Sequence, residues 1–132
     1  MGTATDYRRH IDPEYRRWGR KYPHFPGVAE CLRLLHTRNV RGAWRDIIAY
    51  ELANHAAECL SELVAAFQAN EDEGVRLNVV SAIAEARLPA AIPFIAEVTK
   101  SPHAHLVSYA VKGLKAIGTR EAHAALWEHR LC

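Results

Sequence analysis

Apolar residues recur along the chain with the spacing of helix faces, and the whole pattern repeats at a fixed interval. Trp44, Val75 and Leu106 lie 31 residues apart, and each opens a segment of apolar and small residues at helical spacing. A second apolar segment follows each of them after a short break. A period between about 20 and 50 residues is typical of stacked helical repeats. Such repeats build surfaces more often than catalytic pockets, so the pattern favours a binding protein.

Aligning the chain on this period places apolar residues in columns, which we predict to form the core. The second helix of each pair supplies two columns: Ile48, Val79 and Ala110, and Leu52, Ile83 and Leu114. The first helices supply columns of the same kind: Leu60, Ala91 and Ala122; Leu63, Phe94 and Ala125; Val64, Ile95 and Leu126; and Phe67 with Val98. An earlier copy, shifted by one residue, supplies Val28, Cys31, Leu32 and Leu35.

The same pattern predicts helices joined by short loops, so that neighbouring helices run antiparallel. The expected helices cover residues 27–36, 41–53, 56–68, 74–86, 89–99, 103–117 and 120–130. Ser101 and Thr119 suit helix N-caps, and Asn70 suits the N-cap of helix 74–86 or of the turn that leads into it. Gly118 suits the left-handed position that ends helix 103–117. The predicted fold is all-α: an α-solenoid of about three to four antiparallel helix pairs in a right-handed superhelix.

Residues 1–26 differ from the repeats because cationic and aromatic residues are interleaved there. A short helix is expected from Pro13, with Asp12 as its N-cap. Three aromatic residues fall on one face of that helix: Tyr15, Trp18 and Tyr22. We expect this stripe to pack on the first repeat and cap it. The chain is therefore divided into a basic, aromatic N-terminal arm (1–26) and a helical repeat domain (27–132).

The repeats share a motif in which an apolar-Arg pair precedes small residues. Residues 75–83, which read VRLNVVSAI, match the pair with Val75-Arg76, and residues 110–118, which read AVKGLKAIG, match the small-residue part that follows it. Trp44-Arg45 is a degenerate copy of the pair, and Val107 departs from the arginine. Over residues 40–130 this motif resembles HEAT repeats, specifically the short subtype named after phycobilisome lyases. The resemblance implies an α-solenoid, and it specifies no function because this repeat serves many tasks.

Charge is distributed unevenly, although the net charge is only +2. Residues 1–45 hold 10 Lys and Arg against 4 Asp and Glu, and residues 46–132 hold 7 against 11. The balance is therefore +6 in the first part and −4 in the second. One interpretation is a basic arm that packs on a more acidic body, and the other is an anionic partner such as nucleic acid.

Cysteine use and hydropathy indicate the compartment. The 3 cysteines are an odd number in unmatched contexts, which fits reduced thiols better than a disulfide framework. No apolar run approaches the roughly 20 residues that a membrane-spanning helix needs, and the N-terminus does not resemble a secretory signal. We therefore expect a cytoplasmic protein that does not contact a membrane.

The sequence contains no convincing catalytic or metal-binding motif, so we expect no enzyme, no cofactor and no metal. Of the 8 histidines, His103 and His105 are two residues apart on a predicted helix and cannot share an ion. Cys59 lies four residues after His55, but a pair without a third group is weak evidence for a nucleophile. Cys31 falls in a core column and is expected to serve packing.

The second helices offer a candidate binding ridge, because one set of helices in a solenoid usually carries the partner surface. Tyrosine and arginine, which often dominate interface energy, recur on it. The predicted partner-binding residues are Arg45, Asp46, Tyr50, Arg76, Asn78, Ser81, Glu85, Tyr109, Lys112 and Lys115. Positions 50, 81 and 112 are one column of the repeat and should align side by side.

Three functions compete. The first is a non-catalytic protein-binding solenoid. Stand-alone HEAT-like chains of this size resemble bacterial adaptors and immunity proteins, and this resemblance implies, most concretely, a small adaptor or an immunity protein that neutralises a cognate toxin. The second is nucleic-acid binding through the basic N-terminal arm, which is opposed by the acidic balance of the repeats. The third, suggested by the name of the repeat subtype, is a bilin lyase, and the relatives with that activity are much longer chains. The oligomeric state stays open.

Overall fold

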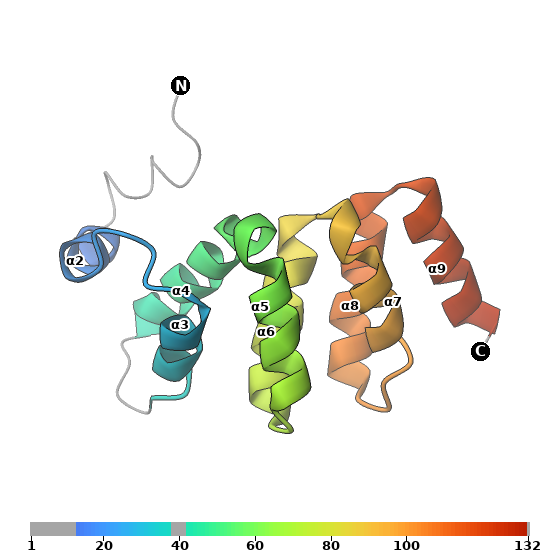
Figure 1. Cartoon of the computed structure of the whole chain (residues 1–132), viewed down its shortest axis with the longest axis horizontal. Helices are drawn as coiled ribbons and strands as arrows, with labels where there is room; N and C mark the ends of the chain where they lie inside the picture. Colours follow the sequence, from blue (N-terminus) through green and yellow to red (C-terminus); the bar gives the residue numbers. More distant parts are fainter. Residues whose placement is uncertain (1–12, 38–41, 132) are drawn as a thin grey trace.

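The computed structural model describes residues 13–37 and 42–131, and over these residues every regular element is helical (Figure 1). The α-helices are α2 (Pro13–Lys21), α3 (Val28–Leu35), α4 (Gly42–Asn54), α5 (Ala56–Ala69), α6 (Glu73–Ala86), α7 (Ile92–Val98), α8 (Ala104–Ile117) and α9 (Arg120–Leu131). The all-α prediction is confirmed, and the predicted ends agree with the observed ones to within a few residues. Asp12, the expected first N-cap, lies outside the described residues.

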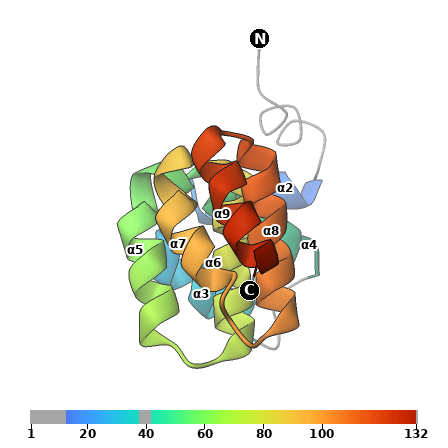
Figure 2. The ribbon, with the colours of Figure 1, turned by 90° about the vertical axis from the view of Figure 1, so that its right-hand side faces the viewer.

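Consecutive helices alternate between two layers. One layer, called here the first-helix layer, contains α3, α5, α7 and α9, and the second-helix layer contains α4, α6 and α8 preceded by α2 (Figure 1, Figure 2). In the second-helix layer, α4 packs against both α2 and α6, and α6 packs against α8. The helix pairs are α3–α4, α5–α6 and α7–α8, with α9 lying against both helices of the last pair. The α-solenoid is therefore confirmed, and the hand of its superhelix stays a prediction.

The predicted columns form the core. In the second-helix layer both columns are at most 1% exposed, and they comprise Ile48, Val79, Ala110, Leu52, Ile83 and Leu114. Every predicted column member of the first-helix layer is buried or packs half-buried against the same cluster. Each helix pair thus buries one apolar face against its neighbours, which is how a solenoid distributes a core along its length.

The spacing between helices is not uniform along the second-helix layer. A Cβ on Gly113 of α8 would lie 2.9 Å from the Cβ and 3.1 Å from the Cα of Ala84 on α6, so these two helices are in close contact. By contrast, α4 is tilted relative to α6, whereas α6 and α8 lie nearly alongside one another (Figure 1). Close packing therefore holds at the α6–α8 contact, and the α4–α6 contact is more open.

The aromatic face of α2 lies against α4, as the stripe predicts. Tyr15 and Trp18 are at most 2% exposed, and Tyr22 is half-buried. The Trp18 ring meets the Trp44 ring edge-on at 5.3 Å, and Nε1 of Trp44 donates to Oε2 of Glu14 at 3.1 Å. Tyr15 and Trp18 join the same core cluster as the repeats. That α2 closes the end of the stack, and that the chain divides after residue 26, stay predictions.

The N-cap of α6 was predicted wrongly. Nδ2 of Asn70 donates to the carbonyl of Ala66 at 2.7 Å, so this side chain satisfies the end of α5 instead. Asp72 is the N-cap of α6 and accepts from the amide of Val75 at 3.0 Å. A carboxylate is favoured there because the amide groups of a helix N-terminus carry partial positive charge.

Ser101 was also predicted wrongly as the N-cap of α8. His103 occupies that position without a side-chain cap, and its amide donates to Oγ of Ser101 at 3.1 Å. Ser101 thus stabilises the turn before the helix. Thr119 is confirmed, because its Oγ1 accepts from the amide of Ala122 at 3.2 Å. Gly118 ends α8 with φ 69°, as expected.

The helix predicted over residues 89–99 is divided. Pro89–Ala91 forms a 3₁₀ turn, and α7 begins only at Ile92. Pro93 explains the division, since a proline has no amide proton and its ring clashes with the carbonyl four residues earlier in a continuous α-helix. The proline is tolerated near the start of α7, where its missing donor would have no partner.

Candidate protein-binding surface

A groove of about 790 Å³ lies between α4 and α6 and extends to the start of α5 and the loop after α6. We call it the α4–α6 groove. Its lining residues are Ala43, Asp46, Ile47, Ala49, Tyr50, Ala53, Asn54, Ala57, Ser81, Ala82, Glu85, Ala86 and Leu88. The tilt of α4 away from α6 accounts for its position in the solenoid (Figure 1).

Small side chains dominate the surface of the groove. Ala49 and Ala53 are four residues apart on α4, Ala57 adds a methyl group from the start of α5, and Ala82 and Ala86 are four residues apart on α6. Residues four apart on a helix share a face, so each wall presents a row of methyl groups. A surface of this kind permits the close approach of another backbone.

Polar side chains line both walls of the groove. Asp46, Tyr50 and Asn54 come from α4, and Ser81 and Glu85 come from α6. Asp46 and Glu85 are exposed, and among the described residues no Lys, Arg or His forms an ion pair with either carboxylate. The groove therefore carries an acidic group on each wall, between small side chains.

Four of the predicted binding residues meet in this groove: Asp46, Tyr50, Ser81 and Glu85. They come from two neighbouring copies of the repeat, as the column of positions 50 and 81 implies. The third member of that column, Lys112, is exposed on α8 but lies outside the groove lining. The close α6–α8 contact is the reason that the groove does not continue to it.

Arg45 and Arg76 are engaged within the chain. Nη1 of Arg45 donates to the carbonyl of Leu35 at 2.8 Å, and Leu35 is the last residue of α3. The guanidinium of Arg76 lies 4.7 Å from the Phe67 ring centroid and its Nε donates to the carbonyl of Asn70 at 2.5 Å. In both pairs the arginine thus satisfies the C-terminal end of the preceding first-layer helix, which explains why the apolar-Arg pair recurs.

The remaining predicted residues lie on α6 and α8, outside the lining of the groove. Asn78 and Tyr109 are half-buried, and Lys112 and Lys115 are exposed. Nζ of Lys112 lies 5.6 Å from the centroid of the Tyr109 ring, a cation–π contact on the surface of α8. These side chains extend the second-helix layer beside the groove without lining it.

Sequence reasoning missed Asn54 and the alanine rows of the groove. The alanines were present in the sequence as a signal, because Ala49 and Ala53 share one face of α4. On α4 these alanines line the groove next to α6.

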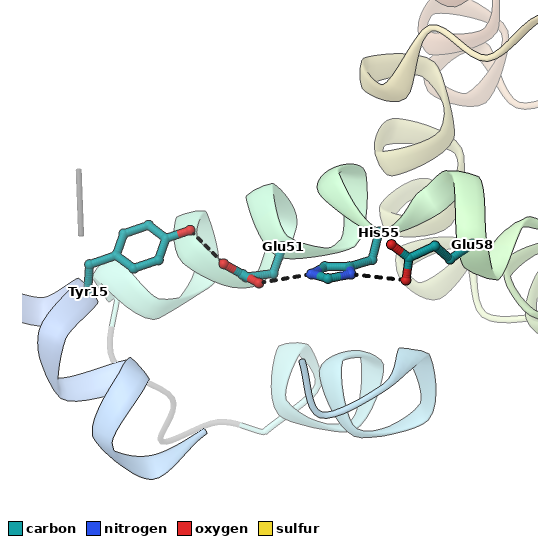
Figure 3. A network of polar contacts seen from close by, with 4 residues as sticks. All are labelled: Tyr15, Glu51, His55 and Glu58. Carbon is teal, nitrogen blue, oxygen red and sulfur yellow. Dashed lines mark hydrogen bonds and ion pairs between the residues drawn. The ribbon is translucent and has the colours of Figure 1, made fainter. Parts of the chain in front are cut away.

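A polar network connects α2, α4 and α5 away from the groove (Figure 3). The hydroxyl of Tyr15 donates to Oε1 of Glu51 at 2.8 Å, and Nε2 of His55 lies 3.6 Å from Oε2 of the same carboxylate. Nδ1 of His55 lies 3.5 Å from Oε2 of Glu58, and the Phe25 ring stacks on the imidazole at 4.1 Å. Glu51 is 1% exposed, so the network compensates a carboxylate inside the core.

The two described thiols are not activated. Burial, together with the nearby carboxylates of Glu51 and Glu30, raises the pKa of the Cys31 thiol to about 12. Burial also raises the pKa of the Cys59 thiol. Both thiols are therefore protonated near neutral pH, which opposes a nucleophilic role for the Cys59 and His55 pair. Among residues 13–37 and 42–131, no three His, Cys, Asp or Glu side chains are grouped to hold a metal ion.

Comparison with known proteins agrees with this architecture. The family model for HEAT repeats matches residues 54–131, which is more than half of the chain, and the chain therefore belongs to the HEAT repeat family. No curated protein and no solved structure matches it. HEAT repeats form helical scaffolds that commonly mediate protein–protein interactions and are generally non-catalytic. The phycobilisome-lyase-like subtype stays a prediction.

The match begins near the end of α4, so α3 and most of α4 lie outside it. These two helices nevertheless pack against each other, and α4 also packs against α6, although the α3–α4 contact is smaller than the contacts within the later pairs. None of the described helices is long and apolar enough to span a membrane.

Proposed function

We propose that this chain is a non-catalytic protein-binding scaffold that holds its partner in the α4–α6 groove. One observation carries the proposal: a groove of about 790 Å³ is lined by four residues of the predicted ridge, from two adjacent repeats. Tyr50 supplies a half-buried aromatic ring at this place, and such residues often dominate the energy of protein interfaces.

Two roles fit such a scaffold, a small adaptor and an immunity protein that neutralises a cognate toxin. Both require a specific protein partner and no chemistry. They differ in what the partner does when it is bound, because an immunity protein suppresses a toxic activity. Expression of the captured partner with and without this chain separates them: restored growth supports the immunity role, and unchanged growth supports the adaptor role.

Nucleic-acid binding is a second candidate, favoured by one observation on α2. Arg16, Arg17, Arg20 and Lys21 are all exposed on this short helix. Binding to random duplex or single strands that weakens steeply with salt would support it. The acidic groove opposes it, because a nucleic-acid surface should be basic along its length.

Site-specific photo-crosslinking tests the leading proposal. A photoreactive amino acid replaces Ala49, which is exposed in the groove, or Ala65, which is exposed on α5 in the other layer. In cells that naturally produce the protein, the Ala49 variant should crosslink to one protein partner and the matched Ala65 variant should not. Equal crosslinking from both positions, or crosslinking from Ala65 alone, would move the interface out of the groove.

A further inference from the structure

We infer that the occupant of the α4–α6 groove is an amphipathic helix of the partner protein, with Lys or Arg placed between Asp46 and Glu85. This inference rests on the proposed function and adds the shape and charge of the bound segment. Three features of the groove support it: its length and walls, its side-chain sizes, and its charge.

The dimensions of the groove suit a helix. Its α4 wall extends from Ala43 to Asn54, which at about 1.5 Å per residue corresponds to roughly three helical turns. A third helix can pack into the groove between two neighbouring helices. The distance between the axes of packed helices is about 8–10 Å and depends on the side chains at the contact, so small side chains permit a close approach. The alanine rows on both walls meet that requirement.

Other modes of peptide recognition fit less well. An extended strand needs an exposed sheet edge, and residues 13–37 and 42–131 contain no strand. A proline-rich segment needs a groove lined by several aromatic rings, and Tyr50 is the one aromatic residue among the lining side chains. Apolar residues at helical spacing would instead rest on the alanine rows.

Charge determines the polar part of the occupant. Asp46 and Glu85 stand on opposite walls, and neither carboxylate has a cationic partner among the described residues. A Lys or Arg of the bound helix would meet both of them, and an acidic segment or a polyanion would be repelled. The groove thus selects a basic helix over an acidic one.

The experiment uses the full chain as bait for a surface-display library of single helices, each about 20 residues long and randomised on one face. The selected helices should be rich in Lys or Arg together with apolar residues at helical spacing. Their affinity should fall by about tenfold or more for the D46N/E85Q variant, which removes both charges with little change of shape. The E62Q/E71Q variant removes two exposed charges outside the groove and should bind as the wild type does.

Circular dichroism confirms that both variants keep their helices. The inference is overturned if the selected helices show no basic enrichment, if D46N/E85Q binds them as well as E62Q/E71Q does, or if the library yields no binder. Crosslinking from Ala49 separates this failure from that of the proposed function. A partner that crosslinks at Ala49 without a basic helix leaves the proposed function standing, and a partner that does not crosslink there removes both.

Discussion

The hydroxyl of Tyr15 donates a hydrogen bond of 2.8 Å to the carboxylate of Glu51, across 36 residues of sequence and between two buried side chains (Figure 3). The contact attaches α2 to the C-terminal turn of α4. It also offsets the desolvation of a carboxylate that is 1% exposed. The N-terminal helix is therefore held to the solenoid by a polar contact as well as by its aromatic face.

Tyr15→Phe should lower the free energy of unfolding by about 1.5–3 kcal/mol, because it removes a hydrogen bond to a buried charged group. Urea denaturation measures the change. Tyr109→Phe serves as the control, because Tyr109 is half-buried on α8. This substitution should change the free energy of unfolding by no more than about 0.5 kcal/mol. Equal effects of the two substitutions would mean that the Tyr15 contact does not hold α2 in place.

Ile83→Ala and Leu114→Ala should each lower the free energy of unfolding by about 2–4 kcal/mol, the usual effect of truncating a buried aliphatic side chain. Both residues are 0% exposed and occupy one column in consecutive repeats. Val111→Ala, on the same helix as Leu114 but half-buried, should have a smaller effect. A change below about 0.5 kcal/mol for either core variant would contradict the assigned repeat register.

Gly113→Ala should destabilise the protein, although alanine is the better helix former by about 1 kcal/mol. The added methyl group would lie 2.9 Å from the Cβ of Ala84, and separating α6 from α8 should outweigh the gain in propensity. A double-mutant cycle with Ala84→Gly measures the interaction energy between positions 84 and 113. Gly113→Ala should be better tolerated when Ala84 is glycine, and an equal effect in both backgrounds would show that the two helices are not in close contact.

Cys31 should make stability fall with rising pH above 9. Its pKa is raised from 9.0 to about 12, so between these values the folded chain keeps a proton that the unfolded chain has lost. The stabilisation is fully present below pH 9 and is lost as pH approaches 12, at up to about 1.4 kcal/mol per pH unit. Denaturation from pH 8 to 10.5 should therefore give a shallower pH dependence for Cys31→Ala than for the control Cys59→Ala. Parallel curves would contradict the burial of this thiol.

The sequence allowed the helices and the core columns to be predicted because periodicity reports directly on which face of a helix is buried. Ile48, Val79 and Ala110 could be aligned without any structure, and all are buried. The contact of Tyr15 with Glu51 could not be predicted, because nothing periodic relates the two residues. It depends on how α2 turns back onto α4.

The candidate site was predicted only in part for a similar reason. Asp46, Tyr50, Ser81 and Glu85 were chosen as outward-facing residues of the repeat, and they do line one groove. Whether a groove exists between two helices depends on their tilt, which is a property of tertiary packing. The same limit applies to Arg45, whose guanidinium turns back to the end of α3, a direction that exposure patterns do not reveal.

The most direct test of the central claim, that the partner binds in the α4–α6 groove, is to fill the groove and measure partner affinity. Ala49→Trp places an indole in the groove, and Ala65→Trp places the same group on the exposed surface of α5 in the other layer. We predict that Ala49→Trp weakens binding of the crosslinked partner by at least about tenfold, while Ala65→Trp binds it as the wild type does. Equal affinities of the two folded variants would contradict the claim.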